Sequence, residues 1–274
     1  MVSVVSGPAF DAQGAAAAFV KARRAAGSLT EYPGVQPTDL ASAYRCQDAA
    51  IALWGDEIVG WKVGWIPAPL SDFHGAQRLV GPIFRRGLRH AQDSHAMDVP
   101  VFAQGFAAIE AEFVVELARD VPPEVSEWSA ESARRFVKTM YIGVEIASSP
   151  LQNINDFGPA VVISDFGNNA GLLLGPEIPD WQTRELAALT CETRIDGEVV
   201  GRGSAASVSG GPLAALAFAL GCNARRGQPM RAGTLVSTGA VTGVHSINAG
   251  QASEAVFTGL GVLRCVTVPM TPVA

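Results

Sequence analysis

Apolar positions recur at helical spacing in two segments near the start of the chain. Residues 15–26 are rich in alanine and are followed by Gly27, a residue that commonly ends helices. In residues 38–54 the apolar side chains fall three or four positions apart, and Thr38 is positioned to cap the first turn. Both segments are therefore predicted to be helical. Two further helices are expected over residues 126–139 and 212–223.

A period of two replaces the helical period in most of the chain after residue 80, and it predicts strands. Between two such runs, Asp196-Gly197 predicts a tight hairpin. Residues 66–105 are interrupted by prolines and are expected to form loops. We predict an α+β fold with a small, largely helical N-terminal region (residues 1–80) and a β-rich domain (residues 81–274). The expected strands cover residues 58–65, 106–117, 140–147, 160–163, 172–174, 189–195, 198–202, 255–257 and 262–268, and residues 235–246 are expected to form a strand that leads into a polar, Gly-rich turn.

Composition narrows the class of protein. With 274 residues, of which 48% are hydrophobic and 17% charged, the chain is expected to be globular. The net charge of −6 and the lack of a basic stripe argue against nucleic-acid binding, and no apolar run is long enough to span a membrane. The N-terminus does not resemble a signal peptide, so we expect a cytoplasmic protein. Reduced, mostly buried thiols are expected at the four scattered cysteines, Cys46, Cys191, Cys222 and Cys265.

Three glutamates interrupt otherwise apolar strands. Glu110 and Glu112 are two positions apart in one predicted strand, so their side chains share a face. Glu145 is isolated among apolar residues in a second strand. Neighbouring buried carboxylates require a neutralising charge, and Mg²⁺ and Mn²⁺ favour carboxylate oxygens. The pattern indicates a divalent-metal site, and the alternative is the solvated face of an edge strand.

Two other segments carry polar groups that are candidates for a binding site. Lys62, one of three lysines in the chain, lies within the apolar strand 58–65. A partly desolvated ammonium group there can bind a substrate carboxylate or stabilise developing negative charge, and the alternative is a lysine that reaches solvent from an edge strand. Asn168, Asn169 and the neighbouring glycines favour left-handed backbone geometry, which predicts a tight turn that can also present amide groups to a ligand.

Seven short motifs resemble, in their order along the chain, the hydratase/decarboxylase branch of the fumarylacetoacetate hydrolase superfamily. The resemblance extends over about residues 10–268. The motifs are Gly60-Trp-Lys62-Val-Gly64, Gly81-Pro-Ile-Phe84, Ile109-Glu110-Ala-Glu112, Gly143-Val-Glu145-Ile146, Asn168-Asn-Ala-Gly171, Gly211-Pro-Leu-Ala-Ala215 and Ser237-Thr-Gly-Ala-Val-Thr-Gly-Val-His245.

The resemblance implies a mixed β-roll core, a bound Mg²⁺ or Mn²⁺ ion, a homo-oligomer and a small-molecule 2-oxo acid substrate. The implied reaction is hydration of a 2-hydroxy-2,4-dienoate, of the 2-oxopent-4-enoate kind, to a 4-hydroxy-2-oxo acid in the catabolism of aromatic compounds. Carried over residue by residue, the resemblance assigns the metal-binding carboxylates to Glu110, Glu112 and Glu145, the active-site lysine to Lys62, and substrate contacts to Asn169 and Thr242.

The chain departs from this branch after the lysine strand. Where the branch usually has a Thr-Ser pair, this chain has Trp65-Ile-Pro67, and the following loop lacks the usual acidic residue, for which Asp72 is the nearest replacement. Arg78 is interpreted as an exposed loop arginine, with recognition of a second anionic group as the alternative. Three other functions therefore stay open: a 2-oxo-acid decarboxylase of the 4-oxalocrotonate type, a hydrolase that cleaves a C–C bond, and a non-catalytic scaffold.

Overall fold

Helices and strands alternate along the chain, which the computed structural model describes at residues 9–92 and 95–273. The α-helices are α1 (Ala12–Arg24), α2 (Leu40–Trp54), α3 (Leu70–His74), α4 (Ala130–Arg134), α5 (Pro159–Ser164) and α6 (Gly211–Arg225). The strands are β1 (Ile58–Trp65), β2 (Arg78–Phe84), β3 (Leu88–His90), β4 (Met97–Val101), β5 (Phe106–Leu117), β6 (Val137–Ser149), β7 (Asn169–Glu177), β8 (Thr190–Ile195), β9 (Glu198–Ser204), β10 (Leu235–Ser237), β11 (His245–Ser246), β12 (Ala252–Phe257) and β13 (Gly261–Pro269). Single 3₁₀ turns connect several of them: η1 (Arg85–Gly87), η2 (Ile154–Phe157), η3 (Phe166–Asn168), η4 (Trp181–Thr183), η5 (Leu186–Ala188) and η6 (Ala205–Ser207).

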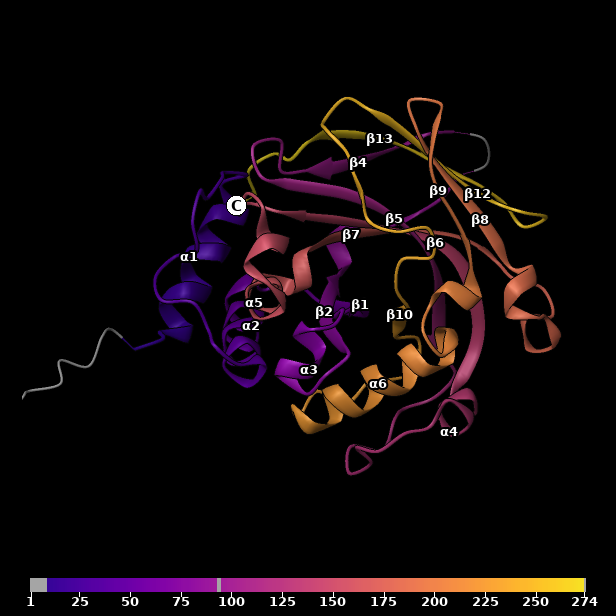
Figure 1. Cartoon of the computed structure of the whole chain (residues 1–274), viewed down its shortest axis with the longest axis horizontal. Coiled ribbons are helices and arrows are strands. Elements are labelled where there is room, and N and C mark those ends of the chain that lie inside the picture. Colours follow the sequence, from indigo (N-terminus) through magenta and orange to yellow (C-terminus); the bar gives the residue numbers. More distant parts are fainter. Residues whose placement is uncertain (1–8, 93–94, 274) are drawn as a thin grey trace, which may run out of the picture.

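The strands form two mixed sheets. The larger sheet has eight strands in the order β2-β1-β10-β5-β6-β7-β3, with β11 paired to β5, and the smaller has five in the order β4-β13-β12-β8-β9. In Figure 1, α1, α2 and α5 lie together at one side of the sheets, and α6 lies below them. Sheets with covering helices confirm the predicted α+β class. Because β1 pairs with β10, residues on both sides of position 80 belong to one sheet, and the division of the chain into two domains there stays a prediction.

The main core lies between the two sheets. Alternate residues of β5, such as Ile109 and Phe113, point into it, and Phe113 meets Phe257 of β12 edge-on with ring centroids 5.6 Å apart. Leucines of α6 close another side of this core. Because side chains alternate along a strand, the intervening residues of β5 face the opposite side of the sheet. That opposite face carries the glutamates of β5.

A second core joins the N-terminal helices to the large sheet. Buried apolar side chains of α1, α2 and α5 pack together there, and Phe19 contacts Tyr32 edge-on. Arg23 of α1 reaches through this layer to Asp165, with Nε 2.5 Å from Oδ1. The same guanidinium group donates to the carbonyl of Asn169. Helix α1 is thereby tied to the segment that precedes β7.

The structure confirms several local predictions. Strand β1 spans residues 58–65 as predicted, and α6 contains the predicted helix 212–223. The hairpin between β8 and β9 has Asp196 and Gly197 at φ 49° and 85°, which is the left-handed geometry that this dipeptide favours. All four cysteines are free and buried, as predicted. Within the described residues, no helix combines the length and the apolar character that crossing a bilayer requires.

Other local predictions are wrong. Residues 160–163, predicted as a strand, lie in α5, because Pro159 starts a helical turn whose β-branched side chains are all buried. The predicted helix 126–139 shortens to α4, where Ser129 accepts a hydrogen bond from the Ser132 N–H and the following residues enter β6. Helix α2 is capped by Asp39 and not by Thr38. Within residues 66–105, predicted as loops, lie α3, β2, β3 and the whole of β4.

Candidate active site

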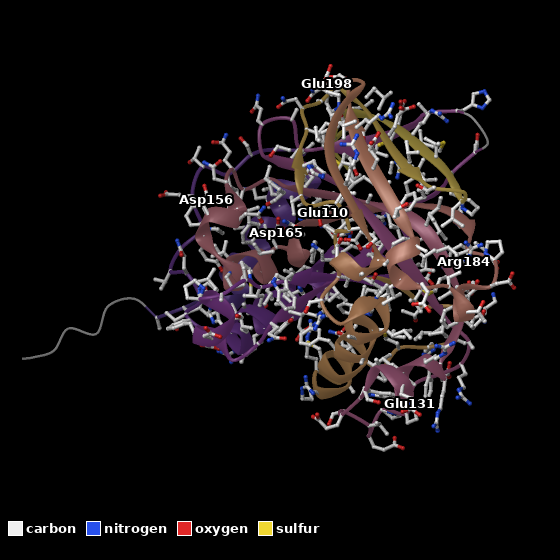
Figure 2. The ribbon with its side chains drawn as sticks, turned by 45° about the vertical axis from the view of Figure 1, so that its right-hand side comes forward. Glu110, Glu131, Asp156, Asp165, Arg184 and Glu198 are labelled. Carbon is white, nitrogen blue, oxygen red and sulfur yellow. The ribbon has the colours of Figure 1, made fainter. Side chains whose placement is uncertain are left out.

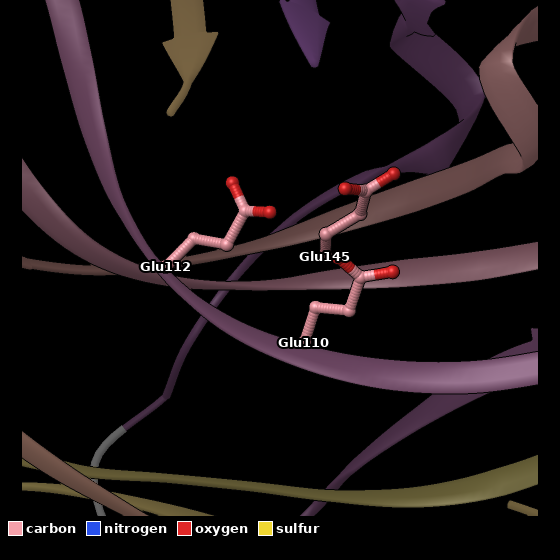
Figure 3. A group of neighbouring side chains, drawn as sticks. All are labelled: Glu110, Glu112 and Glu145. Atoms are coloured by element: carbon pink, nitrogen blue, oxygen red, sulfur yellow. The ribbon is translucent and has the colours of Figure 1, made fainter. Parts of the chain in front are cut away.

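Strands β5 and β6 bring the three glutamates together. Glu110 is directly opposite Glu145 in the antiparallel pair, and Glu112 is two positions further along the same face. Their side chains are buried, and one oxygen of each lies within 4.8 Å of the others. Figure 3 shows the three side chains on the same side of the sheet, and Figure 2 labels Glu110 near the middle of the view. The alternative of a solvated edge strand is excluded, because β5 lies between β10 and β6.

In Glu112 and in Glu145, one carboxylate oxygen accepts hydrogen bonds from the protein and the other has no hydrogen-bond partner within the described part of the chain. The Oε2 atom of Glu112 accepts hydrogen bonds from Ser237 Oγ at 2.5 Å and from the Gly239 N–H at 2.9 Å. The Oε1 atom of Glu145 accepts one from the Asn169 amide at 3.0 Å. Among the described residues, the buried atoms Glu112 Oε1 and Glu145 Oε2 have no hydrogen-bond partner. Buried charged oxygens without a partner are costly, so these two atoms indicate a ligand.

Lys62 reaches the same cluster from β1. Its Nζ lies 3.2 Å from Glu145 Oε1 and donates to the Gly167 carbonyl at 3.1 Å and to Asn168 Oδ1 at 3.2 Å. These three acceptors match the three N–H groups of an ammonium ion. Lys62 is 4% exposed, and β1 lies between β2 and β10, so the alternative of an edge-strand lysine that reaches solvent is excluded.

The electrostatics of the cluster reflect its burial. Burial and repulsion from Glu145 raise the pKa of Glu110 to about 7. Burial, Glu145 and Glu110 together raise the pKa of Glu112 well above its ordinary value. Burial alone would lower the pKa of Lys62, but attraction by the three carboxylates outweighs it and raises that pKa. Without a further cation, the carboxylates therefore retain protons at higher pH than ordinary glutamates do.

The donor set fits a divalent cation. Three carboxylates with one ammonium group leave an excess of two negative charges when all are ionised. The cluster offers oxygen and no nitrogen or sulfur ligands, which suits a hard cation such as Mg²⁺, Mn²⁺ or Ca²⁺. The two unpartnered oxygens belong to the same cluster and would then be satisfied.

A cavity of about 430 Å³ opens from this cluster. Lys62 and Glu110 line one part of it together with Asn155 and Asn168, and apolar side chains line the remainder. A larger groove of about 720 Å³ lies elsewhere, along β1, β3 and the segment before β10, and neither Lys62 nor any of the three clustered glutamates lines it. The chemistry of the cluster is therefore accessible from the smaller cavity.

A left-handed turn positions the partners of Lys62. Phe166, Gly167 and Asn168 have φ values of 55°, 64° and 56°, so the predicted tight turn is confirmed. The turn packs against β2 at Gly81, where a Cβ atom would lie 2.1 Å from the Phe166 carbonyl oxygen. A residue larger than glycine at position 81 would push the turn, and with it the acceptors of Lys62, out of place.

The two predicted substrate contacts lie beside the cavity and do not line it. Asn169 donates to Glu145, as described above, and Thr242 Oγ1 is hydrogen-bonded to Thr193 Oγ1 at 2.7 Å and to His245 Nε2 at 3.1 Å. Their contacts with substrate stay predictions. The sequence places both asparagines in this turn and the resemblance selects Asn169, but it is Asn168 that lines the cavity and contacts Lys62. Only the backbone conformation of the turn decides which of the two amides faces the cavity.

Comparison with known families identifies the fold. Residues 87–268 match the fumarylacetoacetate (FAA) hydrolase C-terminal family. The chain belongs to this family. The three glutamates lie inside the matched segment of the fumarylacetoacetate hydrolase family, whereas Lys62 precedes it.

Curated relatives in this family extend along most of the chain. It is 28% identical over 262 residues to 2-keto-4-pentenoate hydratase 2 of Dechloromonas aromatica (strain RCB), covering 92% of this chain and 96% of that protein. It is also 28% identical over 213 residues to 2-keto-4-pentenoate hydratase of Paraburkholderia phymatum, covering 77% and 78%. A shorter match, 29% over 118 residues, links it to 4-oxalocrotonate decarboxylase of Pseudomonas putida, covering 43% and 44%.

Solved structures share the fold. The 4-oxalocrotonate decarboxylase from Pseudomonas putida G7, complexed with magnesium and adipate, superposes with a TM-score of 0.78 at 21% identity, covering 94% of this chain and 97% of that one. Fumarylpyruvate hydrolase from Pseudomonas aeruginosa, in complex with Mn²⁺ and pyruvate, gives a TM-score of 0.52 at 16% identity, covering 77% and 89%. These similarities establish the architecture around the glutamate cluster.

Proposed function

We propose that this protein is a metal-dependent hydratase that converts a 2-hydroxy-2,4-dienoate to a 4-hydroxy-2-oxo acid. The observation that carries the proposal is the buried cluster of Glu110, Glu112 and Glu145 beside Lys62, next to a cavity that Lys62 and Glu110 line. The hydratases that resemble the chain along most of its length support the same reaction.

Mg²⁺ or Mn²⁺ is the proposed cofactor, held by the three glutamates. When bound, the cation supplies Lewis-acid stabilisation to the oxygens of a 2-oxo acid. The protein contributes the alignment of the ligands, because Ser237 and Gly239 hold Glu112 and Asn169 holds Glu145. It also contributes one balancing charge from Lys62, so the cluster favours a divalent over a monovalent cation.

Lys62 is the proposed catalytic residue. Ketonisation of the dienol removes the 2-hydroxyl proton and adds a proton at the far end of the diene, which leaves a conjugated 2-oxo-enoate. Water then adds at C4 and a proton is added at C3, so one water molecule is consumed. Negative charge develops on the 2-oxygen in both stages, and the ammonium group of Lys62 stabilises it. Because Gly167 and Asn168 hold that ammonium group in place, little reorganisation is needed.

Further proposals come from the family resemblance. Asn169, whose amide donates to Glu145, and Thr242, in the segment between β10 and β11, are proposed to contact the substrate. The sheets are proposed to form the family's β-roll in residues 81–274, behind a small and largely helical region in residues 1–80. We also propose a homo-oligomer that works in the cytoplasm.

A decarboxylase acting on a 2-oxo diacid is the second candidate. The similarity in fold to a 4-oxalocrotonate decarboxylase along nearly the whole chain favours it. Both reactions place the developing charge on the same 2-oxygen, so the glutamate cluster and Lys62 serve either one. The two candidates differ in the group at the far end of the substrate.

The test is to incubate the purified protein with 2-hydroxypenta-2,4-dienoate and Mg²⁺, Mn²⁺ or EDTA, and to follow the absorbance of the diene. We expect metal-dependent loss of absorbance and formation of 4-hydroxy-2-oxopentanoate. Glu112→Gln should abolish turnover, and Glu116→Gln, a matched change on the same strand, should retain it. Release of CO₂ from 2-oxohex-3-enedioate without hydration of the dienoate would favour the decarboxylase, and turnover that survives EDTA unchanged would refute a metal-dependent enzyme.

A further inference from the structure

Most of the residues that line the cavity beside Lys62 and Glu110 are apolar. Trp65 and Leu70 contribute from the end of β1 and from α3, Val162 from α5, and Val244 from the segment before β11. Three of these are large apolar side chains that remain exposed: Trp65 by 49%, Leu70 by 40% and Val244 by 53%. Apolar side chains gathered at the mouth of a cavity typically mark a ligand-binding surface.

The cavity is also larger than a five-carbon acid requires. Such an acid has eight non-hydrogen atoms, and at roughly the volume of a water molecule apiece it would fill about 240 Å³. The cavity measures about 430 Å³. Space therefore remains for a longer substrate, and most of the side chains that line the cavity are apolar.

The described residues lining the cavity include no cation other than Lys62. Arg78, the arginine nearest in sequence to this wall, lies in β2 and does not line the cavity. Its guanidinium group stacks on Trp65, with Cζ 5.1 Å from the ring centroid, and donates to the Ser209 carbonyl. The idea that Arg78 recognises a second anionic group is therefore not supported. A second carboxylate at the far end of the substrate would be desolvated without a partner.

We propose that this site selects 2-oxo acids, and their dienol forms, whose tail is uncharged, apolar and longer than that of a five-carbon acid. Trp65, Leu70 and Val244 are the specificity-determining residues, because they form the exposed apolar mouth. The inference rests on the proposed function, since it takes the 2-oxo-acid end of the ligand to lie at Lys62 and the glutamates. It also separates the two candidate reactions, because the second requires a diacid.

The test compares three ligands by calorimetry in the presence of Mg²⁺: pyruvate, 2-oxohexanoate and 2-oxoadipate. Pyruvate reports on the 2-oxo-acid end alone. Each buried methylene is worth about a fourfold gain in affinity, so we expect 2-oxohexanoate to bind at least tenfold more tightly than pyruvate. 2-Oxoadipate, which has the same carbon chain but a second carboxylate, should bind at least tenfold more weakly than 2-oxohexanoate.

Two variants, each with a matched control, test whether the tail of the ligand contacts the apolar mouth of the cavity. Leu70→Ala should weaken the binding of 2-oxohexanoate several-fold and leave the affinity for pyruvate unchanged. Leu53→Ala, at a similarly exposed helical leucine outside the cavity, should change neither affinity. Val244→Arg should place a cation at the mouth of the cavity and raise the affinity for 2-oxoadipate at least tenfold relative to that for 2-oxohexanoate. Val35→Arg, at another exposed valine, should leave that ratio as in the wild type.

The outcomes separate the two levels of the proposal. If pyruvate binds but 2-oxoadipate binds as tightly as 2-oxohexanoate, the apolar-tail inference is overturned and the proposed function stands. Equal affinities for pyruvate and 2-oxohexanoate would also overturn the inference. If none of the three ligands binds in the presence of metal, the proposed function fails, and the inference fails with it.

Discussion

Replacing Glu112 by glutamine removes one charge from the cluster and almost preserves its shape. In the wild type, Glu112 Oε2 accepts hydrogen bonds from Ser237 and Gly239, and the amide oxygen of glutamine can accept the same two. The amide nitrogen then takes the position of Oε1, the buried oxygen without a hydrogen-bond partner. The variant is therefore expected to fold, but a donor group replaces one of the three oxygen ligands.

The change in stability that Glu112→Gln should cause follows from the distances between the carboxylates. Two unit charges 4.8 Å apart, the upper limit within this cluster, repel each other by about 3 kcal/mol at an effective dielectric constant of roughly 20. Protonation already relieves part of this repulsion, because the pKa of Glu112 is raised. We therefore expect the metal-free variant to be about 1–3 kcal/mol more stable than the wild type. Its affinity for Mg²⁺ should fall at least about 100-fold, or about 2.7 kcal/mol, since a direct ligand is lost.

Thermal unfolding in EDTA and in increasing Mg²⁺ measures both effects. In saturating Mg²⁺ the wild type should gain about 2.7 kcal/mol more stability than the variant, because the two differ about 100-fold in Kd. Glu112→Gln should unfold a few degrees above the wild type in EDTA, and Mg²⁺ should raise its unfolding temperature by several degrees less than that of the wild type. The control is Glu116→Gln, because Glu116 lies on the same strand but bonds to Lys138 and Tyr141. If Mg²⁺ stabilises Glu112→Gln as much as the wild type, the ligand assignment is wrong.

Three further outcomes are expected. The pKa of Glu110 rises from 4.5 to about 7 on folding, so the folded state binds more protons than the unfolded state between these pH values. In EDTA, raising the pH from about 4.5 to 7 should therefore lower the free energy of unfolding by on the order of 3 kcal/mol. Denaturant titrations should show this slope disappearing in saturating Mg²⁺; an unchanged slope would contradict the account. Lys62→Met should reduce kcat for the dienoate by about 100- to 1000-fold while the protein still binds Mg²⁺, and a kcat within threefold of the wild type would exclude its catalytic role. Ser237→Ala should raise the Kd for Mg²⁺ about 10- to 100-fold, as measured by calorimetry, because Glu112 loses a hydrogen bond that orients it; an unaltered Kd would leave Ser237 without this role.

The strand alternation explains why much of the site could be predicted from the sequence. A spacing of two is enough to place Glu110 and Glu112 on one face of β5, whatever the partners of that strand are. Their burial and the position of Glu145 opposite Glu110 depend on strand order and register, which the residues alone do not determine. The ordered motifs of the family resemblance supplied that missing information.

Local conformation explains most of what sequence analysis missed. In the Asn168-Asn169 pair, a left-handed residue at position 168 directs one amide to Lys62 and the next to Glu145, and either asparagine could have been chosen from sequence. Helix α5 is a case in which tertiary burial overrides local preference, because Val162 and Ile163 are β-branched residues in a short buried turn. Arg78 was placed in a loop because prolines punctuate that region, although β2 pairs with β1 there.

Calorimetric titration of oxalate, a small mimic of a 2-oxo acid, tests the central claim most directly. Oxalate is titrated into the protein once in the presence of Mg²⁺ or Mn²⁺ and once after treatment of the protein with a chelator. We expect oxalate to bind only in the presence of metal, and we expect Glu112→Gln, but not Glu116→Gln, to weaken this binding. Binding that is equally strong after chelation, or that is absent from the folded protein under both conditions, would contradict a metal-dependent 2-oxo-acid site at Glu110, Glu112 and Glu145.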